Sequence, residues 1–259
     1  MENLVETLFY FFTYSVIGWI CEDIYVGIGQ RKIVNRGFLY GPYCPVYGFG
    51  ALLVLYGLSN FVDNPILVFI GGVILTSVLE YFTSWIMEVC FHERWWDYTG
   101  YPFNINGRVC LRNSTLFGIM ALVLMYGVQP HITNFYNSFS FRTIALVVLI
   151  VLCLFILDIL FTVKHLLKRN QIVKTVKETL ENAKAEFEAE HKKLTQEQKQ
   201  ALVDWIKANP ALMEKIKRVE EVKNSHISKA FPSRRLTKKD LHDLLQDIIE
   251  ESNKIKYKL

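Results

Sequence analysis

The sequence lacks the short motifs by which many enzymes hold a phosphate, a metal ion or an activated nucleophile. No Gly-x-x-x-x-Gly-Lys loop is present, so the chain does not hydrolyse a nucleotide by that route. A Gly-x-Ser-x-Gly elbow and a His-Glu-x-x-His pair are missing too. These absences argue against an enzyme, and we expect neither a cofactor nor a bound metal ion.

Paired cysteines are missing as well, and positive charge is scarce in the first part of the chain. Residues 1–163 carry 7 Lys and Arg against 10 Asp and Glu, whereas residues 164–259 carry 22 against 15. We therefore expect a transmembrane domain over residues 1–163 and a basic, helical tail over residues 164–259. The five cysteines, with an odd count and no paired spacing, are expected to be reduced core residues.

Long apolar runs dominate the first region, and they predict an all-α, polytopic membrane protein with about five transmembrane helices. A span needs about 20 mostly apolar residues. The second and fourth runs are short, so tilt or a partly re-entrant course is open for them, and the second also begins irregularly around Pro42 and Pro45. No cleavable signal is expected, because Glu2 and Glu6 stand where a positive region would be. The expected spans are roughly Leu4–Val26, Gly41–Leu58, Pro65–Val89, Leu111–Val128 and Phe141–Val163.

The positions of Lys and Arg predict the orientation of the spans, because cytoplasmic loops carry an excess of these residues. The connections after the first and third runs are basic, and so is the start of the tail. The alternate connections, Ser59–Asn64 and Gln129–Ser140, carry no Lys or Arg. We therefore expect a multi-pass protein of the cell membrane with its N-terminus outside and its tail in the cytoplasm. The long stretch Glu88–Gly118 would then lie on the cytoplasmic side.

Ionisable side chains within spans are costly, so each one suggests a function. Five acidic side chains lie in the half of the expected spans that faces the cytoplasm. They are Glu22, Asp23, Glu80, Glu88 and Asp158. Two hypotheses remain open. Either these carboxylates pair with arginines such as Arg36, Arg94, Arg108 and Arg112 and lock the loops together, or they form a polar site open to the cytoplasm. In the second case, the helix start near Asn113 would present free N–H groups that suit a phosphate or carboxylate.

The stretch Glu88–Gly118 holds two weaker indications of function. Glu88 and His92 have a spacing of four, but one histidine among scattered carboxylates is a weak metal signal. The aromatic residues are interpreted most simply as an interfacial belt. These aromatic residues are Trp95, Trp96, Tyr98 and Tyr101.

Four motifs follow one another in the first region: SVIGWICEDIY, RGFLYGPYCPVYGFG, EYFTSWIMEVCFHERWWDY and FNINGRVCLRNSTLFG. Together they resemble a known family of bacterial membrane proteins, the ABC-transporter type IV, or CmpB-like, proteins, and the resemblance covers about residues 1–163. It implies a permease-like protein but no substrate. The matching positions are Gly18, Glu22, Arg36, Gly37, Gly41, Pro42, Pro45, Gly48, Glu80, Glu88, Trp96, Asp97, Asn104, Gly107, Arg108, Cys110 and Leu111.

The sequence predicts an integral membrane protein with a polar site facing the cytoplasm, and the resemblance implies that it is a permease-like membrane component of an ABC-type transporter. The alternative is a non-transporting scaffold or regulator whose tail recruits a partner. Besides the lipid bilayer, the expected partner is a separate ATPase subunit or another soluble cytoplasmic protein. A homo-oligomer is compatible with the sequence, and no nucleic-acid partner is expected. The candidate substrate-binding residues are Glu22, Glu80, Glu88, Arg108 and Arg112.

The expected orientation can be tested with single cysteines placed in the connections. Cysteines at Asn60 and Asn134 should react with an impermeant thiol reagent on whole cells, because both connections lack Lys and Arg. A cysteine at Lys199 should stay unlabelled until the cells are broken. Labelling of Lys199→Cys in intact cells would show that the tail lies outside and would contradict the predicted orientation.

Overall fold

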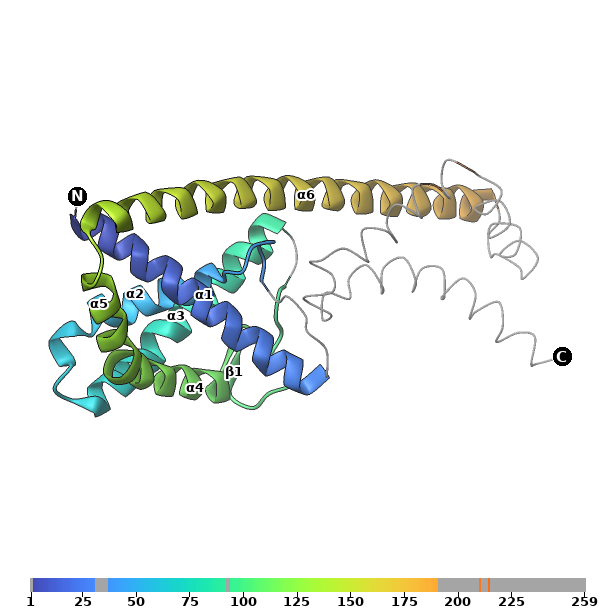
Figure 1. Ribbon diagram of the computed structural model, residues 1–259. Coiled ribbons are helices and arrows are strands. Elements are labelled where there is room, and N and C mark those ends of the chain that lie inside the picture. The colour runs from blue at the N-terminus through green and yellow to red at the C-terminus, as the bar shows by residue number, and fades with distance from the viewer. Residues whose placement is uncertain (1, 31–36, 92–93, 191–209, 211–213, 215–259) are drawn as a thin grey trace. The chain divides into compact units, whose positions relative to one another are not determined.

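The computed structural model describes residues 2–30, 37–91, 94–190, 210 and 214, and their regular structure is almost entirely helical (Figure 1). The expected all-α membrane class is confirmed. The chain divides into two compact units, residues 1–162 and residues 163–259. Most of the second unit, with the tail helices expected beyond Glu190, lies outside the described residues.

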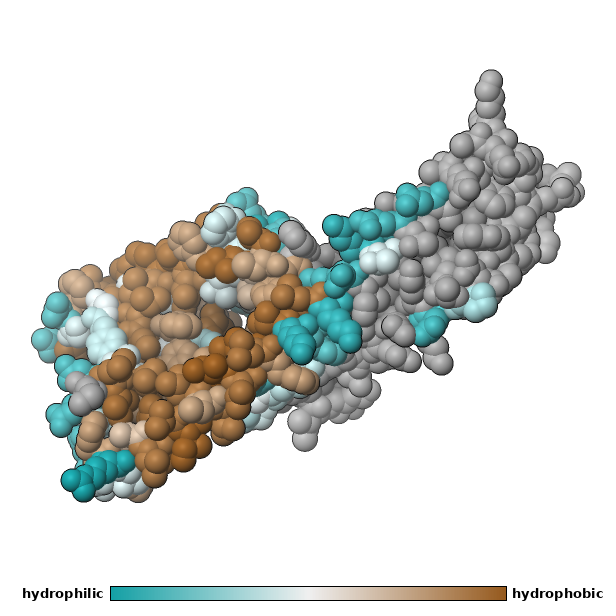
Figure 2. Space-filling view, turned by 90° about the horizontal axis from the view of Figure 1, so that it is seen from above, coloured by the Kyte–Doolittle hydropathy of each residue, from teal (hydrophilic) through white to brown (hydrophobic). Residues whose placement is uncertain are grey.

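Four stretches are long and apolar enough to cross a membrane. They are Glu2–Ile24 in α1 (Glu2–Gln30), all of α3 (Pro65–Phe91), Leu111–Asn137, and Phe141–Lys168 in α6 (Phe141–Glu190). The third stretch joins α4 (Leu111–Leu122), the π-helical η2 (Val123–Val128) and α5 (Gln129–Asn137). Apolar side chains dominate the face of this region seen in Figure 2.

The second expected span, Gly41–Leu58, forms a shorter helix than predicted. The helix α2 (Pro45–Gly57) has 13 residues, which rise about 20 Å and fall short of a hydrocarbon core of about 30 Å. Residues 37–44 precede it as irregular backbone, and the amide of Cys44 bonds to the carbonyl of Ser15 in the middle of α1. Since Tyr47 bonds to Glu22 and Tyr56 bonds to Thr7, α2 runs antiparallel to α1 from that midpoint.

Asp158 of α6 holds the irregular residues that precede α2. Its two carboxylate oxygens accept the backbone N–H groups of Tyr40, at 3.2 Å, and Gly41, at 2.7 Å. The hydroxyls of Tyr43 and Thr162 donate to the same carboxylate. Non-helical backbone at membrane depth must find partners within the protein, and Asp158 provides them.

Close packing of α3 against α4 forms the centre of the bundle. A Cβ added at Gly72 would lie 2.5 Å from the Cβ of Ala121, so only glycine permits this approach. One to two turns further along, the hydroxyl of Ser77 bonds to that of Ser114 at 2.7 Å. The short helix η1 (Ser59–Phe61) joins α2 to α3, and a two-stranded hairpin, β1 (Asn104–Ile105) with β2 (Val109–Cys110), precedes α4.

A second polar network connects α1 to α5 near the start of α1. Tyr14 donates to Gln129, Gln129 bonds to Thr133, and Tyr10 contacts both Thr133 and Glu6. The π-helical η2 lies between this network and the part of α4 that packs on α3. Every polar member of the network therefore has a partner, as expected for a structural contact in a membrane protein.

The role of Asp158 can be measured through Asp158→Asn. An amide retains one acceptor oxygen, so one of the two backbone N–H groups loses its partner, at a cost of about 1–3 kcal/mol. The variant should melt at a lower temperature in detergent than the wild type. Asp63→Asn, a change of the same kind at an exposed position between α2 and α3, serves as the control. Equal melting temperatures for the two variants would show that Asp158 does not hold residues 37–44.

Candidate functional site

One face of α3 carries several residues of the candidate site. Gly72, Thr76, Glu80, Ser84 and Glu88 follow one another at intervals of four, so they form a continuous strip along the helix. The strip begins at the close contact with α4 and becomes polar toward the end of α3. Thr76 satisfies its own hydroxyl by bonding to the carbonyl of Gly72. Glu80 and Ser84 are buried.

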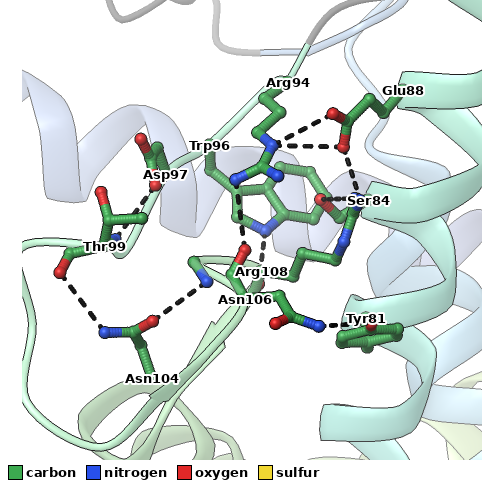
Figure 3. A network of polar contacts seen from close by, with 11 residues as sticks. Tyr81, Ser84, Glu88, Arg94, Trp96, Asp97, Thr99, Asn104, Asn106 and Arg108 are labelled. Carbon is green, nitrogen blue, oxygen red and sulfur yellow. Dashed lines mark hydrogen bonds and ion pairs between the residues drawn. The ribbon is translucent and has the colours of Figure 1, made fainter.

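The segment from Arg94 to Cys110 folds back onto this strip as an ordered structure (Figure 3). The side chain of Asn104 binds the carbonyls of Thr99 and Tyr101 and the amide of Gly107. Gly107 has a φ of +67°, and a Cβ there would lie 2.7 Å from Asp97. The turn therefore requires glycine at this position.

An ion-pair cluster closes the end of α3. Glu88 lies 2.6 Å from Arg108 and 3.2 Å from Arg94. Arg108 is nearly buried; it also approaches the hydroxyl of Ser84 at 3.4 Å and lies over the ring of Tyr81. Two arginines on one carboxylate form a charge-assisted contact that ties the folded-back segment to α3.

Glu80, two turns deeper than Glu88, has a different environment. Its side chain is 6% exposed, and the hydroxyl of Tyr98 donates to its Oε1 at 3.0 Å. The amide of Asn113, in the first turn of α4, donates to the same hydroxyl at 2.6 Å. The other oxygen, Oε2, has no hydrogen-bond partner among the described residues. Glu80 is therefore bound by neutral groups, and no described residue forms an ion pair with it.

Tyr98 keeps its proton in this environment. Burial raises the pKa of Tyr98 well above its usual range, and an ionised Glu80 or Glu22 would raise that pKa further. The phenol is thus a fixed hydrogen-bond donor. On the neighbouring side, the hydroxyl of Tyr47 donates to Glu22 at 2.6 Å, so each of these two carboxylates has a tyrosine partner.

The five predicted site residues separate into three groups. Glu88 and Arg108 form the ion pair that the structural hypothesis proposed. Glu22 and Glu80 lie deeper, with tyrosine partners. Arg112 is exposed and lies over the ring of Tyr101, apart from both carboxylates. Arg36 and His92 lie outside the described residues.

One sequence interpretation needs correction. The interfacial-belt interpretation is wrong for Trp95, which is 3% exposed and packs on Phe38 and Phe91, and for Tyr98, which binds Glu80. At the start of α4, the amide of Leu111 bonds to the carbonyl of Phe103.

Sequence reasoning did not find Tyr47, Tyr98 and Asn113 as partners of the carboxylates. The one available signal was the polar strip on α3, which requires donors from elsewhere without showing where in the chain they lie. Across the described part of the chain, no three His, Cys, Asp or Glu residues are arranged to hold a metal ion. The five cysteines are free thiols.

The ion-pair cluster can be tested by Glu88→Gln. The change leaves Arg108 buried without its counter-charge, so the free energy of unfolding should fall by roughly 2–3 kcal/mol, somewhat below the loss for a fully buried pair. The double variant Glu88→Gln/Arg108→Met should recover much of the melting temperature in detergent. Arg112→Met, at an exposed arginine nearby, should change stability by less than about 0.5 kcal/mol. A double variant no more stable than Glu88→Gln would contradict the pairing.

Comparison with known proteins gives one match. Residues 9–163 match the family described as "Putative ABC-transporter type IV" (ABC_trans_CmpB). No curated protein and no solved structure matches. The matched residues include most of α1, all of α2 to α5, the folded-back segment and most of the membrane part of α6. Because this match covers more than half of the chain, the protein belongs to the CmpB family of ABC-transporter type IV proteins.

Proposed function

We propose that this chain is the permease-like membrane component of an ABC-type transporter, with a polar site around Glu80 that faces the cytoplasm. The observation that carries the proposal is the environment of Glu80. A buried carboxylate in a membrane bundle is expensive, and a structural role would normally give it an arginine or lysine partner. Arg108 instead pairs with Glu88, and Glu80 receives only the hydroxyl of Tyr98. A group held in this costly form suggests function rather than stability.

The irregular course before α2 supports the same proposal. Transporters often place their sites where a membrane helix is discontinuous, because unwound backbone lines the path of the substrate. Here residues 37–44 interrupt the second crossing, and Tyr47, in the first turn of α2, reaches Glu22. The interruption and the two carboxylates therefore belong to one region of the bundle.

A separate subunit would supply the energy. This chain has no phosphate-binding loop, so it catalyses no reaction itself in our proposal, and an ATPase would bind its cytoplasmic side. The orientation follows from the Lys and Arg distribution, which favours a cytoplasmic tail. The membrane would be the bacterial cell membrane.

The alternative function, a scaffold or regulator, is favoured by one observation. The basic tail, with 22 Lys and Arg against 15 Asp and Glu, begins within the continuous helix α6, which extends to Glu190. A long charged helix that leaves the membrane suits the capture of a soluble partner or of anionic lipid headgroups. In this alternative, Glu80 would have no role in transport.

Purification in mild detergent separates the two functions. The full chain, and a chain that stops after Arg169, are each expected to co-purify with an ATPase subunit whose activity requires Mg-ATP. In the full complex, Glu80→Gln should keep its melting temperature and lower the ATPase activity, whereas Asp63→Asn, an exposed carboxylate change, should leave both unchanged. If only the full chain captures a partner, and that partner hydrolyses no ATP, the scaffold is the correct function.

A further inference from the structure

The free oxygen of Glu80 is the strongest unexplained feature of the bundle. The side chain is 6% exposed, its Oε1 accepts one hydrogen bond from Tyr98, and its Oε2 has no partner among the residues described. A carboxylate can accept about four hydrogen bonds, so most of the capacity of this group is unused. Buried polar atoms in proteins are rarely left in this state.

Among the described residues, no Lys or Arg forms an ion pair or a hydrogen bond with Glu80. From α1, Glu22 is near enough for its charge to act on Glu80, and from α2 the phenol of Tyr47 lies beside Glu22. The folded-back segment contributes Tyr98, and α4 contributes the neutral amide of Asn113. A carboxylate in this position would meet the charge of Glu22 and the neutral phenol of Tyr98. Both burial and repulsion therefore oppose an ionised Glu80.

Arg108, which contacts the same strip of α3, is already engaged with other groups. Arg108 lies one to two turns further along the strip, where Glu88, Ser84 and the ring of Tyr81 surround its guanidinium. Moving Arg108 toward Glu80 would leave Glu88 with Arg94 alone and would separate the β2 strand from α3. The cluster at the end of α3 thus fixes the arginine away from the deeper carboxylate.

We propose that Glu80 is a proton-binding site, and that Tyr98 covers it in this conformation. The inference rests on the proposed function and deepens it, because it names the proton as a species that this site takes up. In the covered state, Glu80 is a neutral carboxylic acid whose proton lies on the free oxygen. When the side chain of Tyr98 turns away from Oε1 and water enters, the O–H bond of Glu80 breaks, the proton passes to water, and the carboxylate remains. The reverse transfer reloads the site.

Tyr98 acts in this proposal as a positioning residue and not as a proton carrier. Its raised pKa keeps the phenol protonated, so it can only donate to Oε1. This donation leaves Oε2 as the oxygen that carries the proton. Asn113 of α4 holds the phenol in place, so Tyr98 is bonded to both α3 and α4.

Infrared spectroscopy of the full chain in lipid vesicles at neutral pH tests the proposal directly. A protonated carboxylic acid has a C=O stretch at a higher frequency than an ionised carboxylate, and the wild type should show such a band. Glu80→Gln should lose the band, and Asp63→Asn, a change of the same kind at an exposed carboxylate, should keep it. Tyr98→Phe should keep the band but shift its frequency, because the hydrogen bond to Oε1 is gone.

A wild-type spectrum without such a band, or a band that Glu80→Gln leaves unchanged, would overturn the proposal. Should Glu80→Gln fail to fold, the shift expected for Tyr98→Phe still decides, and an unshifted band would count against the proposal. The measurement needs neither a transported substrate nor an ATPase. Its failure is therefore distinguishable from failure of the proposed function, which is judged by co-purification and ATPase activity.

Discussion

The bundle depends on the need to satisfy every backbone amide at membrane depth. Residues 37–44 leave the helical pattern there, and the carboxylate of Asp158 accepts the amides of Tyr40 and Gly41. This contact joins positions 117 and 118 residues apart in the sequence, so it connects the residues before α2 to α6. Because residues 37–44 are held, α2 can begin halfway along α1, and Tyr47 can reach Glu22. The contact of Tyr47 with Glu22 thus depends on Asp158 of α6.

The segment 94–110 is best understood as part of the bundle wall and not as a connector. It contributes Tyr98 to Glu80, Arg108 to Glu88, and Trp95 to an aromatic contact with Phe38. Its own turns are fixed by Asn104 and Gly107, so it carries these side chains on an ordered backbone. The two carboxylates of α3 consequently receive different partners from the same segment. One gains two positive charges, and the other gains only a phenol.

The sequence was sufficient for the class of protein and for the elements that local pattern determines. Long apolar runs identify α1, α3 and α6, and the interval of four on α3 identifies a strip that avoids lipid. Opposite charge also indicated that Glu88 pairs with arginine. The partner of Glu80 could not be predicted, because Tyr98 is 18 residues away and resembles any interfacial aromatic residue. The short second run, with its irregular start around Pro42 and Pro45, did indicate an interrupted helix, but not that Asp158 accepts the amides there.

The π-helical η2 constrains the number of residues between α4 and α5. A π-turn contains one residue more than the α-helix would need, so it rotates everything beyond it by about 100°. The rotation lets Ser114 and Gly118 face α3 while Gln129 and Thr133 face the tyrosines of α1. Loss of one residue between Val123 and Val128 would restore a regular helix and turn one of these two faces toward lipid. Natural relatives that keep both faces should therefore conserve the length of this stretch more strictly than its side chains.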